Sequence, residues 1–341
     1  MVDAFIAKGF TYFDTAWMYC NFGSEDATKE FLTSRYPRDK FTLTTKLHAG
    51  FLKTKEDRDR IFNTQLKKTG VDFFDYYLIH DINSHSLEVY DKLDCFNWIQ
   101  DKKAKGLVKH IGFSFHDNAE LLDKVLTEHP EFEYVQLQLN YLDWESNSIQ
   151  SHKCYDVAVK HNKPIIVMEP VKGGTLANLT PELDSKFKAV RPDDSAASWA
   201  LRYVGSLPGV LSILSGMSDE AQMNDNIKTF VDFEPLTEEE QNVVSEVRDV
   251  MLGANLIACT SCRYCTDGCP MGISIPDVFR AVNTLRLYPA DEFRPKMFYQ
   301  GLAERTAKAS SCVECGQCEG VCPQHLTIVD YLKEAAAAFE N

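Results

Sequence analysis

Short apolar runs alternate with longer amphipathic stretches along the first two thirds of the chain. Stretches such as 57–69 and 89–105 repeat apolar residues with a helical period, and a further helix is predicted from Val2 to Lys8. Nearly continuous apolar strands separated by helices are typical of a parallel sheet covered on both faces. Seven such strands are predicted, at 10–14, 41–46, 75–80, 108–114, 134–139, 165–168 and 210–214.

This pattern favours a (β/α)8 TIM barrel from which one strand is missing. Such a barrel closes with eight strands, whereas the sequence shows seven and begins with a helix. We therefore expect the first strand to be absent, leaving a gap with unpaired edges at the two flanking strands. The sequence does not distinguish a true start at Met1 from an internal methionine. The alternative is a doubly wound open sheet, but no G-x-G-x-x-G loop follows any predicted strand.

The alternation stops after the seventh strand and its helix. Pro235 marks a boundary, and Thr237 and Glu240 have the spacing of a capping box that opens a new helix. We expect a barrel domain at residues 1–235 and a small all-α domain at residues 236–341. Further helices, without any strand, are predicted at 275–287, 296–309 and 326–339.

Most of the 11 cysteines fall in two copies of one motif. Both copies have the pattern C-x2-C-x2-C-x3-C-P and end at Pro270 and Pro323. This is the spacing of bacterial ferredoxins, in which three thiolates of one run and the fourth of the other hold each [4Fe-4S] cluster. The two runs must then pack together. Cross-ligation assigns one cluster to Cys259, Cys262, Cys265 and Cys322, and the other to Cys312, Cys315, Cys318 and Cys269.

Two other uses of these cysteines are less favoured. Structural zinc prefers two separated C-x2-C pairs, whereas each run here places three cysteines within seven residues. A disulfide framework suits small secreted domains, whereas this chain is large and we expect it to carry no signal peptide.

Four polar residues lie at or just beyond the ends of the first three predicted strands. Asp14, Lys46 and His80 end successive strands, and Tyr19 lies five residues beyond Asp14. Taken singly, each has an ordinary structural explanation, such as a helix cap or a hydrogen-bonded core histidine. Active sites of TIM barrels lie at the carboxyl ends of the strands, so their joint occurrence there favours a catalytic site.

The order and spacing of these four residues resemble the Asp, Tyr, Lys, His tetrad of the aldo-keto reductase family, over about residues 1–226. The resemblance implies NAD(P)H-dependent carbonyl reduction, with Tyr19 as the general acid. Lys46 would favour the phenolate, Asp14 would hold Lys46, and His80 would donate a hydrogen bond to the substrate oxygen. The cysteine-bearing end is similar to that of a bacterial subgroup with a ferredoxin-type extension.

The same resemblance implies contacts to the nicotinamide cofactor. Ser114 and Gln136 would bind its carboxamide, and Met168 stands where an aromatic residue usually stacks on the ring. The segment for the adenosine phosphate contains Gly216, Gln222 and Asn226. The first two of these replace the Lys and Arg that would bind a 2′-phosphate, so NADH is at least as well supported as NADPH.

Charge and composition disfavour some classes of binding partner. Fifty acidic residues against 36 basic residues give a net charge of −14, which disfavours nucleic acid and anionic membranes as partners. No apolar run is long enough for a membrane helix and no signal peptide is recognisable, so we expect a cytoplasmic protein.

Three hypotheses follow. The first is an oxidoreductase acting on a small-molecule carbonyl substrate, with two clusters that transfer electrons, for example to a redox partner protein. Since hydride carries two electrons and a cluster accepts one, a flavin could supply the connecting step. The second is an electron-transfer or partner-binding protein whose barrel no longer binds nicotinamide. The third, and weakest, is a zinc-stabilised dehydrogenase.

Overall fold

The computed structural model describes residues 1–147, 149–287 and 292–340. The chain divides into two compact units. The barrel unit comprises Met1–Leu139, Asp143–Pro170 and Leu201–Pro235, and the C-terminal unit comprises Asn140–Leu142, Val171–Ala200 and Leu236–Asn341. The domain boundary after residue 235 stays a prediction, because the segment 171–200 precedes it in sequence but groups with the C-terminal unit.

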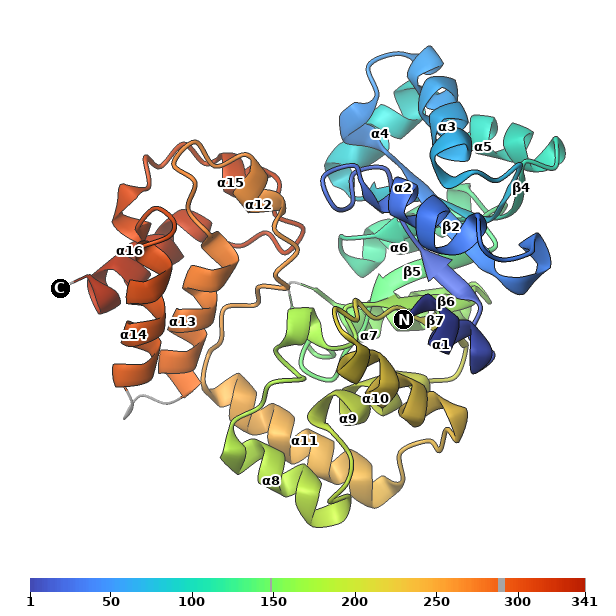
Figure 1. The fold of residues 1–341 in the computed structure, drawn as a ribbon. Helices are drawn as coiled ribbons and strands as arrows, with labels where there is room; N and C mark the ends of the chain where they lie inside the picture. Colours follow the sequence, from blue (N-terminus) through green and yellow to red (C-terminus); the bar gives the residue numbers. More distant parts are fainter. Residues whose placement is uncertain (148, 288–291, 341) are drawn as a thin grey trace. The chain divides into compact units, whose positions relative to one another are not determined.

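Seven parallel strands form one sheet in the described part of the barrel unit, in the order β1 to β7 (Figure 1). Their bounds are β1 Tyr12–Asp14, β2 Thr42–His48, β3 Phe74–Ile82, β4 Val108–Phe115, β5 Tyr134–Gln138, β6 Ile165–Met168 and β7 Val210–Ile213. The sheet curves into a nearly closed barrel, and within the described residues the outer edges of β1 and β7 pair with no strand. The TIM-barrel fold and the predicted gap are confirmed.

Helices follow the strands around this sheet. The barrel unit contains α1 Val2–Ala7, α2 Ser24–Thr28, α3 Lys55–Thr69, α4 Ser84–Lys92, α5 Cys95–Ala104, α6 Ala119–Glu128, α7 Ser151–Lys160 and α10 Glu220–Val231, and α9 Ala196–Gly205 continues from one unit into the other. The single helix predicted at 89–105 is wrong. Asp94 adopts a left-handed conformation with φ 57°, which separates α4 from α5.

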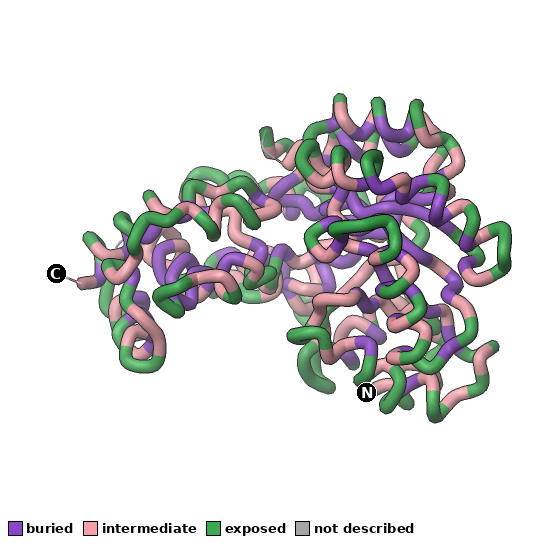
Figure 2. The backbone as a smooth tube through the Cα atoms, turned by 90° about the horizontal axis from the view of Figure 1, so that it is seen from above, coloured by how far each residue is buried: buried purple, intermediate pink, exposed green. Residues whose placement is uncertain are grey.

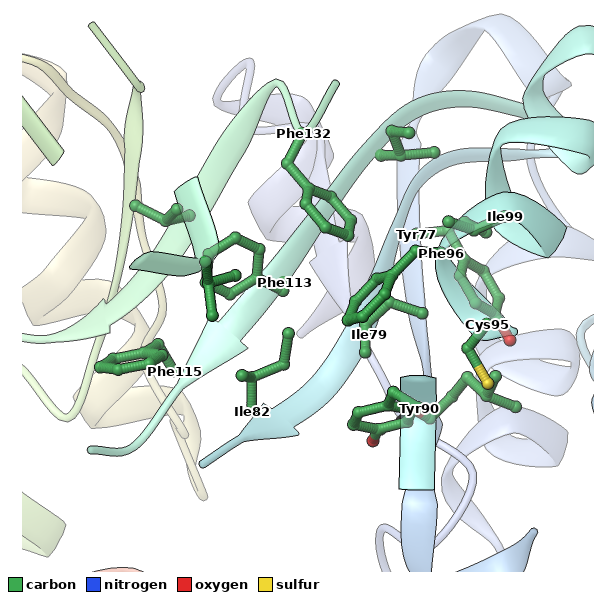
Figure 3. Close-up of a cluster of buried hydrophobic side chains, with 14 of the residues drawn as sticks. Tyr77, Ile79, Ile82, Tyr90, Cys95, Phe96, Ile99, Phe113, Phe115 and Phe132 are labelled. Atoms are coloured by element: carbon green, nitrogen blue, oxygen red, sulfur yellow. Dashed lines mark hydrogen bonds between the residues drawn. The ribbon is translucent and has the colours of Figure 1, made fainter. Parts of the chain in front are cut away.

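Alternating side chains of each strand face opposite sides of the sheet. Tyr77 and Ile79 of β3 and Phe113 of β4 face the helices, where Phe96 and Ile99 of α5 pack near them (Figure 3). All five residues are buried, and buried positions run along the strands in Figure 2. This layer between sheet and helices is the main core of the barrel unit.

A second, smaller apolar layer fills the inside of the barrel. It contains Leu78, Tyr134 and Ile166. Gly112 of β4 lies opposite Tyr134 in the register of β4 and β5, and a Cβ atom at Gly112 would lie 2.6 Å from both the ring and the carbonyl oxygen of Tyr134. Only glycine leaves room for this tyrosine inside the barrel.

The described part of the C-terminal unit is helical, as predicted. It contains α8 Pro181–Val190, α11 Glu238–Gly253, α12 Tyr264–Asp267, α13 Ile275–Leu287, α14 Phe293–Ala303, α15 Gln317–Gly320 and α16 Ile328–Phe339. Helices α13, α14 and α16 pack against one another (Figure 1). Phe279, Tyr299 and Leu332 belong to the apolar core between them. Thr237 and Glu240 form the predicted capping box. None of the described helices combines the length and the apolar content needed to cross a bilayer.

The helix predicted at 296–309 ends early, at Ala303. The backbone N–H of Ala309 donates to the hydroxyl oxygen of Tyr299 at 2.8 Å rather than to a carbonyl one helical turn before it. A short 3-10 turn lies at Ala309–Ser311.

Candidate functional site

The inner face of the barrel brings most of the predicted site residues into one layer. Six predicted site residues each lie two positions after a strand residue at the level of the inner apolar layer. They are Asp14 after Tyr12, Lys46 after Thr44, His80 after Leu78, Ser114 after Gly112, Gln136 after Tyr134 and Met168 after Ile166. Because strand side chains alternate with a period of two, residues two apart share a face. The six side chains therefore gather at the carboxyl ends of β1 to β6.

A buried ion pair lies at the centre of this layer. The ammonium of Lys46, which is fully buried, donates to Oδ1 of Asp14 and, at 2.9 Å, to the carbonyl oxygen of Thr15. Burial raises the pKa of Asp14, and the neighbouring Lys46 opposes that rise. Burial lowers the pKa of Lys46, and Asp14 opposes that fall. The pair is held by mutual attraction against the cost of removing both charges from water.

Tyr19 and His80 complete the group of four. Tyr19 lies in the loop after β1, and Nζ of Lys46 is 4.8 Å from the centre of its ring. The rings of Tyr19 and His80 stand nearly perpendicular, at 80°, with centres 5.8 Å apart. The structure thus brings Asp14, Tyr19, Lys46 and His80 together, as the resemblance implied.

His80 is held neutral by its surroundings. Burial lowers its pKa well below 6.5, and His48, Lys46 and His116 lower it further. The hydroxyl of Tyr90 in α4 donates to the carbonyl oxygen of His80, which fixes the end of β3. Among the described residues, Nδ1 of His80 has no hydrogen-bond partner. A neutral imidazole carries one N–H, which can donate a hydrogen bond to a substrate oxygen.

Sequence reasoning missed two residues beside this group. The ring of His48 lies 5.2 Å from that of His80, and Nε2 of His48 is 3.7 Å from Oδ2 of Asp81. The backbone N–H of Gly50 donates to Nδ1 of His48 at 3.0 Å, so a neutral His48 carries its proton on Nε2, toward Asp81. His48 could have been predicted from the sequence, because side chains alternate along a strand and His48 is therefore the next residue after Lys46 on the inner face.

The residues predicted to contact the carboxamide form a polar pair. Ser114 and Gln136 are partners in the register of β4 and β5, and both are buried. The Ser114 hydroxyl accepts from the backbone N–H of Asp81 at 2.8 Å, and Nε2 of Gln136 lies 3.4 Å from the sulfur of Met168. Within the described residues, Oε1 of Gln136 lacks a partner. The unpartnered Oε1 of Gln136 can accept a hydrogen bond and the Ser114 hydroxyl can donate one, which matches the N–H and C=O groups of a carboxamide.

The segment predicted to bind the adenosine phosphate connects β7 to α10. Oε1 of Gln222 accepts from the backbone N–H of Ser218 at 2.8 Å, and Nδ2 of Asn226 donates to Oγ of Ser215 at 2.8 Å. Asp219 caps the start of α10 through the N–H of Gln222. Gln222 thus supports the loop, Gly216 offers no side chain, and a carboxylate stands at the helix terminus. This arrangement does not favour a 2′-phosphate.

The two cysteine runs fold in the same way. The backbone N–H of Ser261 donates to Sγ of Cys259 at 3.4 Å, and that of Glu314 donates to Sγ of Cys312 at 3.4 Å. Ser261 and Glu314 both adopt left-handed conformations, with φ 55° and 56°. A short helix follows in each run, α12 and α15. The repeated sequence therefore gives a repeated cysteine loop.

The second cysteine loop lines a cavity together with the last cysteine of the first run. Its lining includes Cys269 as well as Cys312, Cys315 and Cys318. Within the described residues, no three His, Cys, Asp or Glu side chains are arranged to hold a single metal ion. Four thiols around one cavity match the donor set of a [4Fe-4S] cluster, including its predicted fourth ligand from the other run.

The other four cysteines are also neighbours. Burial raises the pKa of Cys259 to about 11 and that of Cys265 to about 12. In both cases the nearby thiols of Cys262 and Cys322 add to the rise. Cys322 comes from the second run, so it lies within electrostatic reach of the first, where cross-ligation needs it.

Comparison with known protein families decides what the barrel is. Residues 1–249 match the aldo/keto reductase family. The chain belongs to the aldo/keto reductase family. Residues 258–327, which contain both cysteine loops, match the 4Fe-4S dicluster domain. This aldo/keto reductase is therefore an oxidoreductase that carries a ferredoxin-type domain. No curated protein matches its sequence.

Solved structures with similar folds are themselves aldo-keto reductases. The holo form of an aldo-keto reductase from Bacillus halodurans is 21% identical in sequence and has a TM-score of 0.55. The match covers 72% of this chain and 84% of the Bacillus chain. The Klebsiella pneumoniae protein in complex with NADPH is 21% identical, with 72% and 83% covered and a TM-score of 0.56. The Brucella melitensis protein is 24% identical, with 71% and 86% covered and a TM-score of 0.55. These likenesses support the barrel fold.

Proposed function

We propose that this aldo/keto reductase reduces the carbonyl group of a small molecule with a nicotinamide cofactor, and that its C-terminal unit carries two [4Fe-4S] clusters for electron transfer. The observation that carries the first part is the buried ion pair of Lys46 and Asp14 beside Tyr19 and His80. A fully buried lysine is costly to maintain, and such groups cluster at functional sites.

Each of the four side chains has a role in the proposed reaction. A bound nicotinamide would supply a hydride to the carbonyl carbon, giving an alcohol and the oxidised cofactor. Tyr19 gives its phenolic proton to the carbonyl oxygen, and the Lys46 ammonium stabilises the phenolate left behind. His80 is neutral and donates a hydrogen bond to the same oxygen, which orients the substrate and stabilises the negative charge that develops there.

The residues at β4, β5 and β6 support nicotinamide binding. The unpartnered Oε1 of Gln136 would accept from the carboxamide nitrogen, and the Ser114 hydroxyl would donate to the carboxamide oxygen. Met168 packs beside Gln136 and would contact the ring. Because Gly216 and Gln222 provide no cation, we propose that the protein uses NADH at least as well as NADPH.

The cysteine cavity and the match to a dicluster domain support the iron-sulfur part of the proposal. A [4Fe-4S] cluster exchanges one electron at a time with its redox partner. The proposed ligands are those of the cross-ligation pattern, with Cys269 and Cys322 exchanged between the two runs. A small redox partner protein is the natural electron acceptor or donor. None of the comparisons names a flavin, so the step that links hydride to single electrons has no assigned group.

One experiment tests both parts. The protein is purified without oxygen, its iron and sulfide are quantified, and visible spectra are recorded before and after addition of NADH, NADPH and dithionite. About eight irons per chain are expected for two clusters. Bleaching of the clusters by a nicotinamide would connect the two chemistries, whereas bleaching by dithionite alone would separate them. An iron-free protein with bound zinc would overturn the iron-sulfur part.

The barrel reaction is tested by carbonyl-dependent oxidation of NADH and NADPH across a panel of aldehydes and ketones. Tyr19→Phe is expected to abolish this activity while leaving the iron content unchanged. The matched control is Tyr155→Phe, which removes a hydroxyl that donates to the carbonyl oxygen of Pro208 and should leave activity intact. If the wild-type protein binds neither nicotinamide, the barrel reaction is refuted and the electron-transfer alternative replaces it.

A further inference from the structure

The loop that carries Tyr19 has an unusual backbone conformation. The three residues that follow Tyr19, namely Cys20, Asn21 and Phe22, all lie in the left-handed region, with φ of 52°, 52° and 64°. Residues other than glycine rarely adopt this conformation, and each one that does so costs free energy. Phe22 is also 41% exposed, so the burial of its ring is incomplete. This left-handed turn therefore persists only because the contacts around it determine its conformation.

Lys68 of α3 makes a charged contact with the left-handed turn. Its ammonium donates to the carbonyl oxygen of Phe22. The same ammonium lies 3.7 Å from Oε2 of Glu25, 3.3 Å from Oδ2 of Asp26 and 5.3 Å from the centre of the Trp17 ring. The side chain of Lys68 is only 16% exposed, and that of Glu25 is fully buried. Lys68 therefore joins the left-handed turn to the start of α2.

Glu25 in turn connects α2 to the strand that carries Lys46. Oε1 of Glu25 accepts from the hydroxyl of Thr45 at 2.8 Å. Nε2 of Gln65 donates to Oγ1 of Thr45 at 3.1 Å and to the carbonyl oxygen of Lys46 at 2.9 Å. Burial raises the pKa of Glu25, and Thr45 and Lys68 oppose that rise. A connected buried network of this kind makes the surrounding structure rigid.

A second set of hydrogen bonds joins the loop to the catalytic group. The backbone N–H of Ser24 donates to the carbonyl oxygen of Tyr19 at 3.2 Å, and the Thr15 hydroxyl donates to Oγ of Ser24 at 2.7 Å. The carbonyl oxygen of Thr15 accepts from the Lys46 ammonium at 2.9 Å. The loop is thus anchored on both sides of the left-handed turn, and the charge of Lys68 holds the turn itself.

We infer that Lys68 is a positioning residue for the proposed carbonyl reduction, because it holds the left-handed turn and thereby fixes Tyr19 beside Lys46. The inference rests on the proposed function, in which Tyr19 gives its proton while Nζ of Lys46 lies 4.8 Å from the centre of its ring. Lys68 acts through the loop and not on the substrate. A displacement of about 1 Å in a catalytic group can lower a rate about 100-fold.

The test compares Lys68→Met with the wild type in carbonyl-dependent oxidation of NADH and NADPH. Methionine keeps the apolar stem and removes the ammonium. We expect kcat to fall about 10- to 100-fold, while KM for the carbonyl substrate and Kd for the nicotinamide change less than about twofold. Lys68→Arg keeps a cation that can donate to Phe22 and should recover most of kcat. If Lys68→Met does not fold, Glu25→Gln replaces it; this variant keeps an acceptor for Thr45, removes the charge that faces Lys68 and should also lower kcat.

The matched control is Lys102→Met. The side chain of Lys102 is 10% exposed, and its ammonium lies 2.5 Å from Oδ1 of Asp59 and 5.5 Å from the centre of the Trp98 ring. Its environment resembles that of Lys68, but its partners belong to α3 and α5, so Lys102→Met should leave kcat unchanged. Hydrogen exchange of the backbone amides of residues 20–24 gives a measurement independent of activity. Exchange should be faster in Lys68→Met and unchanged in Lys102→Met.

The outcomes separate this inference from the function on which it rests. If the wild type oxidises neither nicotinamide with any carbonyl compound, the proposed function fails and the inference fails with it. If the wild type is active but Lys68→Met keeps its kcat or its exchange at residues 20–24, the inference alone is overturned. An equal loss of kcat in Lys102→Met would also overturn it, because lower stability would then be the cause. So would a Lys68→Arg variant as slow as Lys68→Met, because the charge would then not hold the turn.

Discussion

Replacing Lys46 by methionine tests the physical basis of the proposed site through folding stability, independently of any substrate. Lys46→Met keeps the length and apolar stem of the side chain but removes its ammonium. The partner carboxylate of Asp14 is then left with its side chain only 13% exposed and without its cation. The carbonyl oxygen of Thr15 loses its donor as well.

The expected cost is about 3–5 kcal/mol of unfolding free energy, because removal of one partner leaves an uncompensated buried charge. Asp14→Asn combined with Lys46→Met removes the second charge too, and should recover at least about half of that loss. The control is Lys105→Met, which breaks an exposed pair with Asp101 and should change stability by less than about 1 kcal/mol.

The loss should also depend on pH, with a defined sign. Burial already raises the pKa of Asp14 above its usual 3.8, and Lys46 opposes the rise, so Lys46→Met should raise this pKa further. A carboxyl group with a raised pKa binds its proton more tightly in the folded state. The variant should therefore regain stability as pH falls through the raised pKa toward 3.8, and lose it again as pH rises.

Urea unfolding followed by tryptophan fluorescence measures this change. Trp17, Trp98 and Trp144 belong to the barrel unit, so the signal reports mainly on its unfolding. Circular dichroism of the same samples checks whether one transition describes the whole chain. A loss below about 1 kcal/mol in Lys46→Met would refute the reasoning, and so would a double variant no more stable than the single one.

Three further predictions concern other parts of the molecule. Gly112→Ala should lower the unfolding free energy measured in urea by about 1–3 kcal/mol, because its Cβ would lie 2.6 Å from Tyr134; an unchanged midpoint would contradict the barrel packing. Cys269→Ala should remove the cluster beside Cys312 and about half of the iron, and loss of the other cluster would disprove cross-ligation. His80→Gln should lower kcat/KM about 100-fold without changing the pH profile above 6.5, since the pKa of His80 lies well below that value; loss in the variant of a step that the wild type shows there would mean that His80 titrates in the reaction.

The fold could be predicted from the sequence because its signals are local. Apolar runs separated by amphipathic stretches gave all seven strands, and the cysteine spacing pointed to a ferredoxin-type segment. Residues 89–105 show where such signals fail. Their apolar pattern continues through Asp94, whose left-handed conformation is not encoded by periodicity. The predicted helix at 296–309 also fails at its end: Ala309 lies beyond α14 and its N–H donates to the hydroxyl of Tyr299, a contact that a helical pattern cannot reveal.

The candidate site was predictable only in part, for a related reason. Asp14, Lys46 and His80 end their predicted strands, and that position alone grouped them as a candidate site. His48 and Asp81 lie in β2 and β3 but belong to no familiar motif, and the structure shows the ring of His48 beside that of His80 and its Nε2 near Asp81. The contact of Gly173 with Thr260 joins segments separated by about 90 residues, and no spacing rule connects them.

The proposed chemistry places a constraint on how the two units can work together. Hydride transfer delivers both electrons together, whereas each cluster accepts one, so two clusters have the capacity for a hydride but not the means to divide it. A nicotinamide should therefore reduce the clusters slowly unless another group separates its electrons. If carbonyl reduction proceeds while NADH leaves the clusters oxidised, the clusters serve a different electron donor.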